Sequence, residues 1–295
     1  MPPNAFVFTA GRASPRAIAG PLLSCLAAFA IAACGRRTAD IATSKSAAGT
    51  DRTVTVTATD YVFDAPDQIP SGMTTMRLVN NGHELHHVQL VRLTGGKTAA
   101  DLSTALNHPG PPPPWMVSAG GPNAAAPGGT TEATLMLTPG NYVMLCFIPG
   151  ADHVPHLAKG MVRPLTVTDV ASAANVTPHS DVTITMTDYA FALSSPITAG
   201  SHTLQVINQG KQDHEAVLVR LAPGKKASDL AAWIDNPVGP PPAEPLGGTT
   251  AFAVGSGGYV TVDFTPGHYA LLCFIPDNQD GKPHAAHGMT QEFTI

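Results

Sequence analysis

The sequence predicts an all-β protein that contains two copies of one globular fold. Three observations predict it: an internal repeat, strand-type alternation of apolar residues at the start of each copy, and an abundance of turn-forming residues. The 295-residue chain has 28 Gly and 28 Pro, and only 13% of its residues are charged. This composition is typical of a loop-rich β protein.

The repeat covers nearly all of the chain after residue 52. The segments TDYVF, VNNGHELHHVQLVRL, TPGNYVMLCFIP and PHLAKGM return as TDYAF, INQGKQDHEAVLVRL, TPGHYALLCFIP and PHAAHGM. His86 and His214 are 128 residues apart, and Cys146 and Cys273 are 127 apart. A period of this length is too long for a solenoid and fits a domain of about 115 residues. We expect domain 1 at residues 52–170, a linker at 171–180 and domain 2 at 181–295.

The N-terminus predicts export. Arg12 and Arg16 precede an apolar stretch, residues 17–33, that is shorter than a membrane span, as in a signal peptide at 1–33. Its end, Ala32-Ala33-Cys34, resembles the lipobox of bacterial lipoproteins. That resemblance implies cleavage before Cys34, acylation of its thiol, and anchoring to a bacterial membrane on the periplasmic or exterior side. The alternative is an ordinary secretory signal. Residues 34–51 then form the lipidated Cys and a flexible tether.

The cysteines fit this interpretation. Of four Cys, Cys25 would be removed with the signal peptide and Cys34 would carry lipid. Cys146 and Cys273 remain, one at the same place in each repeat. Exported proteins usually pair their thiols in disulfides, so one unpaired Cys in each repeat indicates a metal ligand.

Each repeat opens with a strand that has one buried face. Val54, Val56 and Ala58 alternate with Thr, and residues 182–187 repeat the pattern. Further strands are expected at 76–79, 87–93, 134–137 and 142–147, and at 203–207, 215–221, 259–264 and 269–274.

One short helix is expected in a long loop of each repeat. Leu230, Trp233 and Ile234 have helical spacing before Pro237, and Leu102, Ala105 and Leu106 have it before Pro109. Proline runs at 111–114 and 240–242 follow the helices and lie outside the sheets, as stiff loops or as a partner-docking surface.

A set of four metal-ligating side chains occurs in the same order in both repeats. One His comes early, and Cys, His and Met come close together late. A trigonal copper site made of two imidazoles and a thiolate, with a weak axial thioether, needs these four residue types. The first set is His86, Cys146, His156 and Met161, and the second is His214, Cys273, His284 and Met289.

These motifs resemble those of the cupredoxins, the blue copper domains of the plastocyanin and azurin class, over nearly all of residues 52–295. The resemblance implies two tandem Greek-key β-sandwiches with one copper ion in each. It implies the two sets above as ligands, and it implies that Asn80 and Asn208 tie loops together near the Cys, outside the ligand shell.

The sequence departs from the family pattern in one respect. Nine residues separate Cys146 from His156, and ten separate Cys273 from His284, where the family has only a few. Because loop entropy rises slowly with length, a longer loop can bulge and still return its His, but it can also misplace it. His153 lies in this loop and is an alternative to His156. It belongs to a group of histidines without a His counterpart, expected to be exposed or incidental: His83, His87, His108, His153, His202, His268 and His287.

The chain is not expected to be an enzyme. Copper oxidases and nitrite reductases place His next to the Cys ligand, but here its neighbours are Leu145 and Phe147, then Leu272 and Phe274. No His-x-His pair occurs. The best interpretation is an electron-transfer protein with two mononuclear copper sites and an unidentified redox protein partner. The alternatives are a copper storage or delivery protein, and a metal-free partner-binding module. The formal net charge of −5 and the lack of a basic stripe make nucleic acid an unexpected partner.

Overall fold

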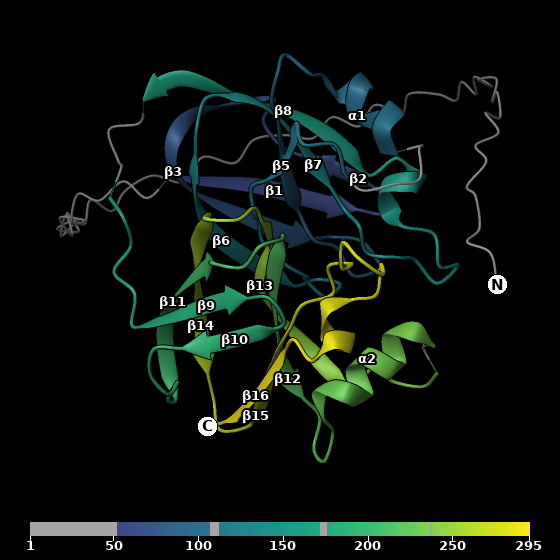
Figure 1. Cartoon of the computed structure of the whole chain (residues 1–295), viewed down its shortest axis with the longest axis vertical. Helices are drawn as coiled ribbons and strands as arrows, with labels where there is room; N and C mark the ends of the chain where they lie inside the picture. The colour runs from purple at the N-terminus through teal and green to yellow at the C-terminus, as the bar shows by residue number, and fades with distance from the viewer. Residues whose placement is uncertain (1–51, 107–111, 172–175, 237) are drawn as a thin grey trace, which may run out of the picture. The chain divides into compact units, whose positions relative to one another are not determined.

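The computed structural model describes residues 52–106, 112–171, 176–236 and 238–295 (Figure 1). The predicted signal peptide, Cys34 and the tether lie outside these residues, as do His108, Pro109, Pro237 and part of the predicted linker. The residues that the structure describes belong to one compact unit. Its described part is built mainly of strands, and the expected tandem β-sandwich is confirmed.

The first repeat forms two sheets that share one long strand. In one sheet, β1 pairs antiparallel with β2 and parallel with β3, and β3 pairs antiparallel with β6. In the other, the beginning of β3 pairs with β8, followed by β7, β4 and β5. These strands are β1 (Thr53–Thr59), β2 (Val62–Asp64), β3 (Gln68–Asn80), β4 (Gln89–Leu93), β5 (Met116–Ser118), β6 (Thr130–Leu137), β7 (Gly140–Leu145) and β8 (Val162–Ala171).

The second repeat has the same two-layer plan. One sheet has the order β10-β9-β11-β14 and the other the order β13-β12-β15-β16. Its strands are β9 (Val182–Thr187), β10 (Ala190–Leu193), β11 (Gly200–Asn208), β12 (His214–Leu221), β13 (Ala243–Phe252), β14 (Gly257–Phe264), β15 (His268–Leu272) and β16 (Thr290–Thr294).

The two expected helices are present. They are α1 (Ala99–Leu106) and α2 (Ala227–Asp235). Thr98 and Asp101 cap the start of α1 reciprocally, because each side chain bonds to the other residue's backbone N–H. Each helix packs on one sheet through an apolar cluster separate from the main core. Leu102 of α1 packs with residues of β4 and β7, and Leu230 of α2 packs with residues of β12 and β15.

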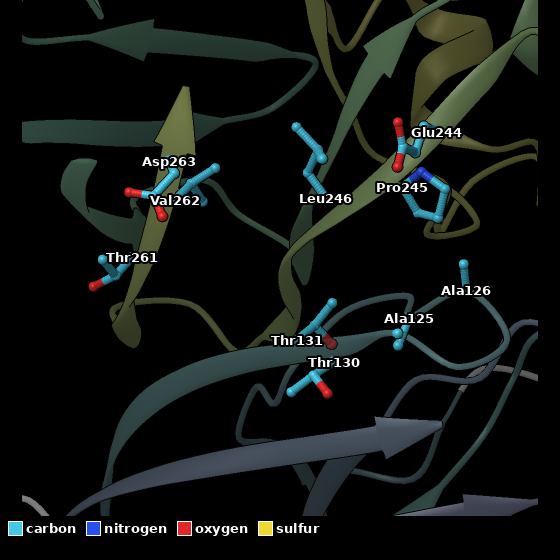
Figure 2. Close-up of a pocket in the computed structure, with 11 residues that line it drawn as sticks. Ala125, Ala126, Thr130, Thr131, Glu244, Pro245, Leu246, Thr261, Val262 and Asp263 are labelled. Carbon is cyan, nitrogen blue, oxygen red and sulfur yellow. The ribbon is translucent and has the colours of Figure 1, made fainter. Parts of the chain in front are cut away.

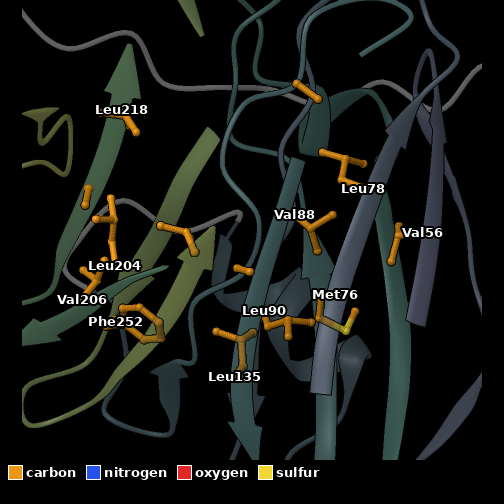
Figure 3. Close-up of a cluster of buried hydrophobic side chains, with 14 of the residues drawn as sticks. Val56, Met76, Leu78, Val88, Leu90, Leu135, Leu204, Val206, Leu218 and Phe252 are labelled. Carbon is orange, nitrogen blue, oxygen red and sulfur yellow. The ribbon is translucent and has the colours of Figure 1, made fainter. Parts of the chain in front are cut away.

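The repeats are joined by backbone hydrogen bonds and by a common core. Strand β14 pairs with β6 at Gly258 and Tyr259, and residues 118–123 bond with 248–253 at the end of β13. The main cluster of buried apolar side chains contains residues of both repeats (Figure 3). Phe252, 1% exposed, belongs to this cluster and lies against Gly120 of the first repeat.

Gly121, which bonds across this junction, must be a glycine because its backbone also approaches that of Val88 within the first repeat. Its φ is +148°, and a Cβ built there would lie 1.9 Å from the carbonyl oxygen of Val88. Only glycine allows both that backbone conformation and that contact. The hydrogen bond from Thr250 N–H to the Gly121 carbonyl, 3.0 Å, is formed at the same place.

A groove of about 340 Å³ also lies at the junction (Figure 2). It is lined by residues of both repeats, including Thr131, Glu244 and Asp263. None of the predicted metal ligands lines it. Neither helix in the described part of the chain has the length and apolar character needed to cross a bilayer.

We expect Phe252→Ala to lower the free energy of unfolding by about 3–5 kcal/mol, the usual cost of deleting a buried aromatic ring. Val254→Ala is the control, because Val254 is 53% exposed and its truncation should cost less than about 0.5 kcal/mol. Chemical denaturation of the metal-free protein measures both. Equal effects of the two changes would contradict the placement of Phe252 in a common core.

Candidate metal centres

The first His of each set is positioned by a loop that an Asn side chain closes. Asn80, the last residue of β3, donates from Nδ2 to the carbonyls of Glu84 and Ala125, both at 2.8 Å. Its Oδ1 accepts the N–H of Gly82 at 2.9 Å. Ala125 in turn forms a two-way backbone bridge with His86. The loop from β3 to His86 is therefore fixed to the neighbouring segment.

Asn208 has the same role in the second repeat. Its Nδ2 donates to the carbonyls of Gln212 and Phe252, and its Oδ1 accepts the N–H of Gly210. Phe252 pairs with His214 between β12 and β13. Both Asn side chains thus lie outside the ligand sets, as expected. The loop that each of them holds is the one that leads to the first His.

In the long segment after each Cys, a β-bridge between two prolines closes the base of the loop. Cys146 directly follows β7, and Pro149 forms a β-bridge with Pro155. His156 N–H then donates to the carbonyl of Ile148 at 3.0 Å. The extra residues form a turn between the two prolines, with residues 151–153 exposed, so the extra loop length does not displace His156.

The second loop closes in the same way. Pro276 bridges Pro283, and His284 N–H donates to Ile275 at 2.9 Å. A short 3₁₀ helix begins at each of these histidines, η1 (His156–Lys159) and η2 (His284–His287). Neither long loop therefore displaces its His from the His-Cys-His triangle.

Both methionines are fixed by the same backbone framework. Cys146 N–H donates to the carbonyl of Met161 at 3.3 Å, and Met161 N–H donates to the carbonyl of His156 at 3.0 Å. Cys273, Met289 and His284 repeat these bonds at the same lengths. Met161 and Met289 are fully buried.

In each repeat, two imidazole nitrogens and one sulfur face one another. In the first centre, Cys146 Sγ lies 3.5 Å from His156 Nδ1 and 4.0 Å from His86 Nδ1, and the two Nδ1 atoms are 3.1 Å apart. In the second centre, Cys273 Sγ lies 3.3 Å from His284 Nδ1 and 3.9 Å from His214 Nδ1, and the Nδ1 atoms are 3.0 Å apart. All six residues are fully buried.

These triangles have the size that one metal ion requires. Metal–ligand bonds of about 2.0–2.3 Å, at angles of roughly 100–120° to one another, place the ligand atoms about 3–4 Å apart, which is the range of the six distances above. A thiolate and two imidazoles, with the buried thioether of the Met that follows the second His, form the donor set that suits copper. The residues present therefore fit one copper ion in each repeat, two in the chain.

Several solved structures resemble the chain, although no protein-family description and no curated protein matches it. Auracyanin from Roseiflexus castenholzii is 24% identical and covers 41% of this chain and 99% of its own, with a TM-score of 0.27. Auracyanin B is 25% identical over 41% of this chain and 92% of its own, with a TM-score of 0.30. A multicopper oxidase is 12% identical over 83% of this chain and 88% of its own, with a TM-score of 0.23.

The class of the protein follows from its own fold and sites. Two successive β-sandwiches each bury one His-Cys-His triangle, with the ligands in the order that the sequence predicts. The chain is a tandem cupredoxin-like protein. Its centres differ mainly in the groups that surround the ligands.

Carboxylates contact the outer nitrogens of three of the four ligand histidines in this cupredoxin-like chain. His86 Nε2 lies 2.9 Å from Asp60 Oδ1, and His214 Nε2 lies 2.9 Å from Asp188 Oδ1. His156 Nε2 lies 2.7 Å from Glu84 Oε2. A carboxylate at Nε2 holds the N–H there and leaves Nδ1 with its lone pair facing the sulfur, as a metal requires.

Glycine is needed for the contact with the aspartate. A Cβ on Gly82 would lie 2.4 Å from Asp60 Oδ1 and 2.7 Å from His86 Nε2. Burial alone would raise the pKa of Asp60, but hydrogen bonds from His86 and His83 outweigh it and hold this pKa below its ordinary value. Asp60 is therefore a carboxylate at neutral pH.

Burial disfavours the charged forms of both thiols, and it lowers the pKa of His156 and of His284. It raises the pKa of the Cys146 thiol to about 12, and it also raises that of Cys273. Burial, together with the nearby His214, lowers the pKa of His284 to about 4. Metal binding must therefore displace a proton from each thiol, whereas the ring of His284 is already neutral.

One further buried side chain in each repeat, which the sequence did not predict, bonds to the backbone beside the Cys ligand. His87, expected to be exposed or incidental, is buried, and its Nε2 accepts the N–H of Phe147 at 2.9 Å. Burial, reinforced by His156 and His86, lowers the pKa of His87 to about 3, so its ring is neutral. In the second repeat, Glu215 accepts the N–H of Phe274 at 3.0 Å. Both groups fix the backbone beside the Cys ligand.

Among the described residues, none of the other histidines without a His counterpart belongs to a His-Cys-His triangle. His83 is almost fully exposed, although its ring contacts Asp60. His153 is exposed in the turn between the two prolines and does not replace His156. The repeated TDY motif was the signal for the missed aspartates, since it places Asp60 and Asp188 at matching positions.

We expect Cys146→Ser and Cys273→Ser each to remove one copper and leave the other, because each repeat contains a complete triangle. Elemental analysis after copper loading should fall from about two ions per chain to about one with either change. Loss of both ions from a single change would show that the repeats share their ligands.

Proposed function

We propose that the protein is an electron carrier that holds one copper ion in each repeat and exchanges single electrons with a redox protein outside the cytoplasm. The observation that carries the proposal is the complete burial of both His-Cys-His triangles. A catalytic metal site keeps an open position for substrate or water. Here the sandwich covers the ligands, which favours the transfer of electrons through the protein.

The ligands suit small rearrangement on electron transfer. A bound copper ion would supply one-electron chemistry between its two oxidation states. The chain would hold it with a plane of two imidazoles and one thiolate, a set that matches both states. Hydrogen bonds to Asp60 and Glu84 fix the rings of His86 and His156 from outside. The ligands are therefore positioned by the protein and need not move when the charge changes.

The surroundings of the Cys ligands argue against an oxidase or reductase. Leu145 and Phe147 flank Cys146, so no imidazole leads from this ligand to another copper. Apart from the two triangles, one other group of potential ligands occurs among the described residues: Asp277, Asp280 and His287. It contains a single imidazole, and Tyr189, Gln212 and Lys282 already contact its carboxylates.

Purified protein loaded with copper should bind about two ions per chain and show an intense blue thiolate-to-copper band on oxidation. Stopped-flow mixing with a small one-electron reductant should bleach the band reversibly. Tight but colourless copper would instead indicate storage or delivery, and no copper uptake would indicate a metal-free partner-binding module.

Export and lipid anchoring form part of the same proposal. The lipobox-like Ala32-Ala33-Cys34 supports a lipid on Cys34 after cleavage of the signal peptide. We expect Cys34→Ser to move the exported protein from the membrane fraction to the soluble fraction. Cell fractionation tests this, and membrane association that persists in an exported Cys34→Ser protein would contradict the anchor.

A further inference from the structure

The second His of each centre differs in what its outer nitrogen contacts. In the first repeat, His156 Nε2 lies 2.7 Å from Glu84 Oε2, and both rings of the centre have a carboxylate partner. In the second repeat, the position of Glu84 is taken by Gln212. Among the described residues, His284 Nε2 has no hydrogen-bond partner, and the nearest carboxylate oxygen, of Asp277, is 3.9 Å away.

We propose that Glu84 is a positioning residue that lowers the reduction potential of the first copper centre through its hydrogen bond to His156. This inference rests on the proposed function, because it requires that the centre hold copper. The oxidised ion carries one more positive charge than the reduced ion. A negative group that bonds to a ligand of that ion stabilises the oxidised state more, and it also makes the ligand a stronger donor.

The contacts of Glu84 show that it is held in place for this role. Its Oε1 accepts the Tyr61 hydroxyl at 3.3 Å, while Oε2 faces His156. Tyr61 also covers the ring of His156, with the ring centroids 4.8 Å apart. Lys159 donates to the Tyr61 hydroxyl at 3.1 Å and pairs with Asp152 at 2.8 Å. The carboxylate therefore approaches His156 from a fixed direction, although 30% of its side chain is exposed.

Gln212 has a different set of contacts in the second repeat. Its Nε2 donates to Asp277 Oδ2 at 2.9 Å, and its Oε1 accepts the N–H of Asn278 at 3.1 Å. Tyr189 donates to the same oxygen of Asp277. The amide thus ties Asp277 to the loop, and that carboxylate bonds to these donors instead of to His284.

The inference concerns the first centre alone. In the second repeat, the buried carboxyl group of Glu215 lies beside Cys273, where the first repeat has His87. The two centres therefore differ on the Cys side as well, and Glu84 does not determine which of them has the higher potential. The contact with His156 predicts only how the potential of the first centre changes when Glu84 is replaced.

The test uses the full chain with Cys273→Ser, so that only the first centre is blue. Glu84→Gln keeps an oxygen that can accept from His156 but removes the charge. Spectroelectrochemical titration of the blue band should show a rise in potential of about 59 mV or more, a tenfold change in the equilibrium constant for one electron. The position of the band should stay the same, because the copper ligands are unchanged.

Asp152→Asn is the matched control. Like Glu84→Gln, this change removes one negative charge. Asp152, however, is 57% exposed and pairs with Lys159 instead of with a ligand histidine. Its shift should be less than half of that of Glu84→Gln. Glu84→Asp, which keeps the charge on a shorter side chain, should give a potential between those of the parent and Glu84→Gln, and it provides the test if Glu84→Gln does not fold.

The outcomes separate this inference from the proposed function. If the Cys273→Ser parent binds no copper or shows no blue band, the proposed function fails at the first centre. If the parent is blue but Glu84→Gln leaves its potential unchanged or lowers it, the proposed role of Glu84 is wrong. An equal rise with Asp152→Asn would also overturn it, because that result would show general surface charge rather than a contact with His156.

Discussion

The rest of this structure depends on burying polar metal-ligand atoms that face one another inside a β-sandwich. Burying imidazoles and a thiol is costly unless their polar atoms find partners. Asp60 and Glu84 satisfy the outer nitrogens of His86 and His156, while the inner nitrogens point at each other across 3.1 Å. Carboxylates therefore bond to the Nε2 atoms of the first centre, and the Nδ1 atoms remain available to a metal. The rings need no reorientation when a metal enters.

The same constraint explains the construction of the long loops. A long loop that is held only at its two ends can adopt many conformations, and closing it costs only a little more entropy than closing a short loop. Here the bridge between Pro149 and Pro155 makes the residues near the centre behave as a short loop, and the excess length lies beyond the bridge. The prolines lack an N–H, so they leave no unsatisfied hydrogen-bond donor at the bridge. The length of a Cys-to-His loop is therefore a poor guide to the position of its His.

How much could be predicted from sequence depends on the range of the interaction. The repeat, the strand starts near Val54 and Val182, both helices and the ligand triangles follow from local patterns and from duplication. The partners of those ligands were not predicted: Asp60 recurs as Asp188 in the TDY motif, but Glu84 is replaced by Gln212, so duplication gives no signal for it. Asp60 and Glu84 are 26 and 72 residues from the histidines that they contact. His87 was misjudged because it has no His counterpart, although Glu215 replaces it in the same role at Phe274.

The junction between the repeats was also beyond sequence reasoning, because pairing between repeats leaves no periodic signal. It matters for the second centre. Phe252 pairs with His214, accepts the Asn208 amide and packs on Gly120 of the first repeat. Asn123 of the first repeat donates to Glu215 at 3.3 Å, next to His214. A chain cut between the repeats would expose Phe252 and leave Glu215 without Asn123. Each ligand set is complete within its own repeat, yet the framework that holds the second set includes residues of the first.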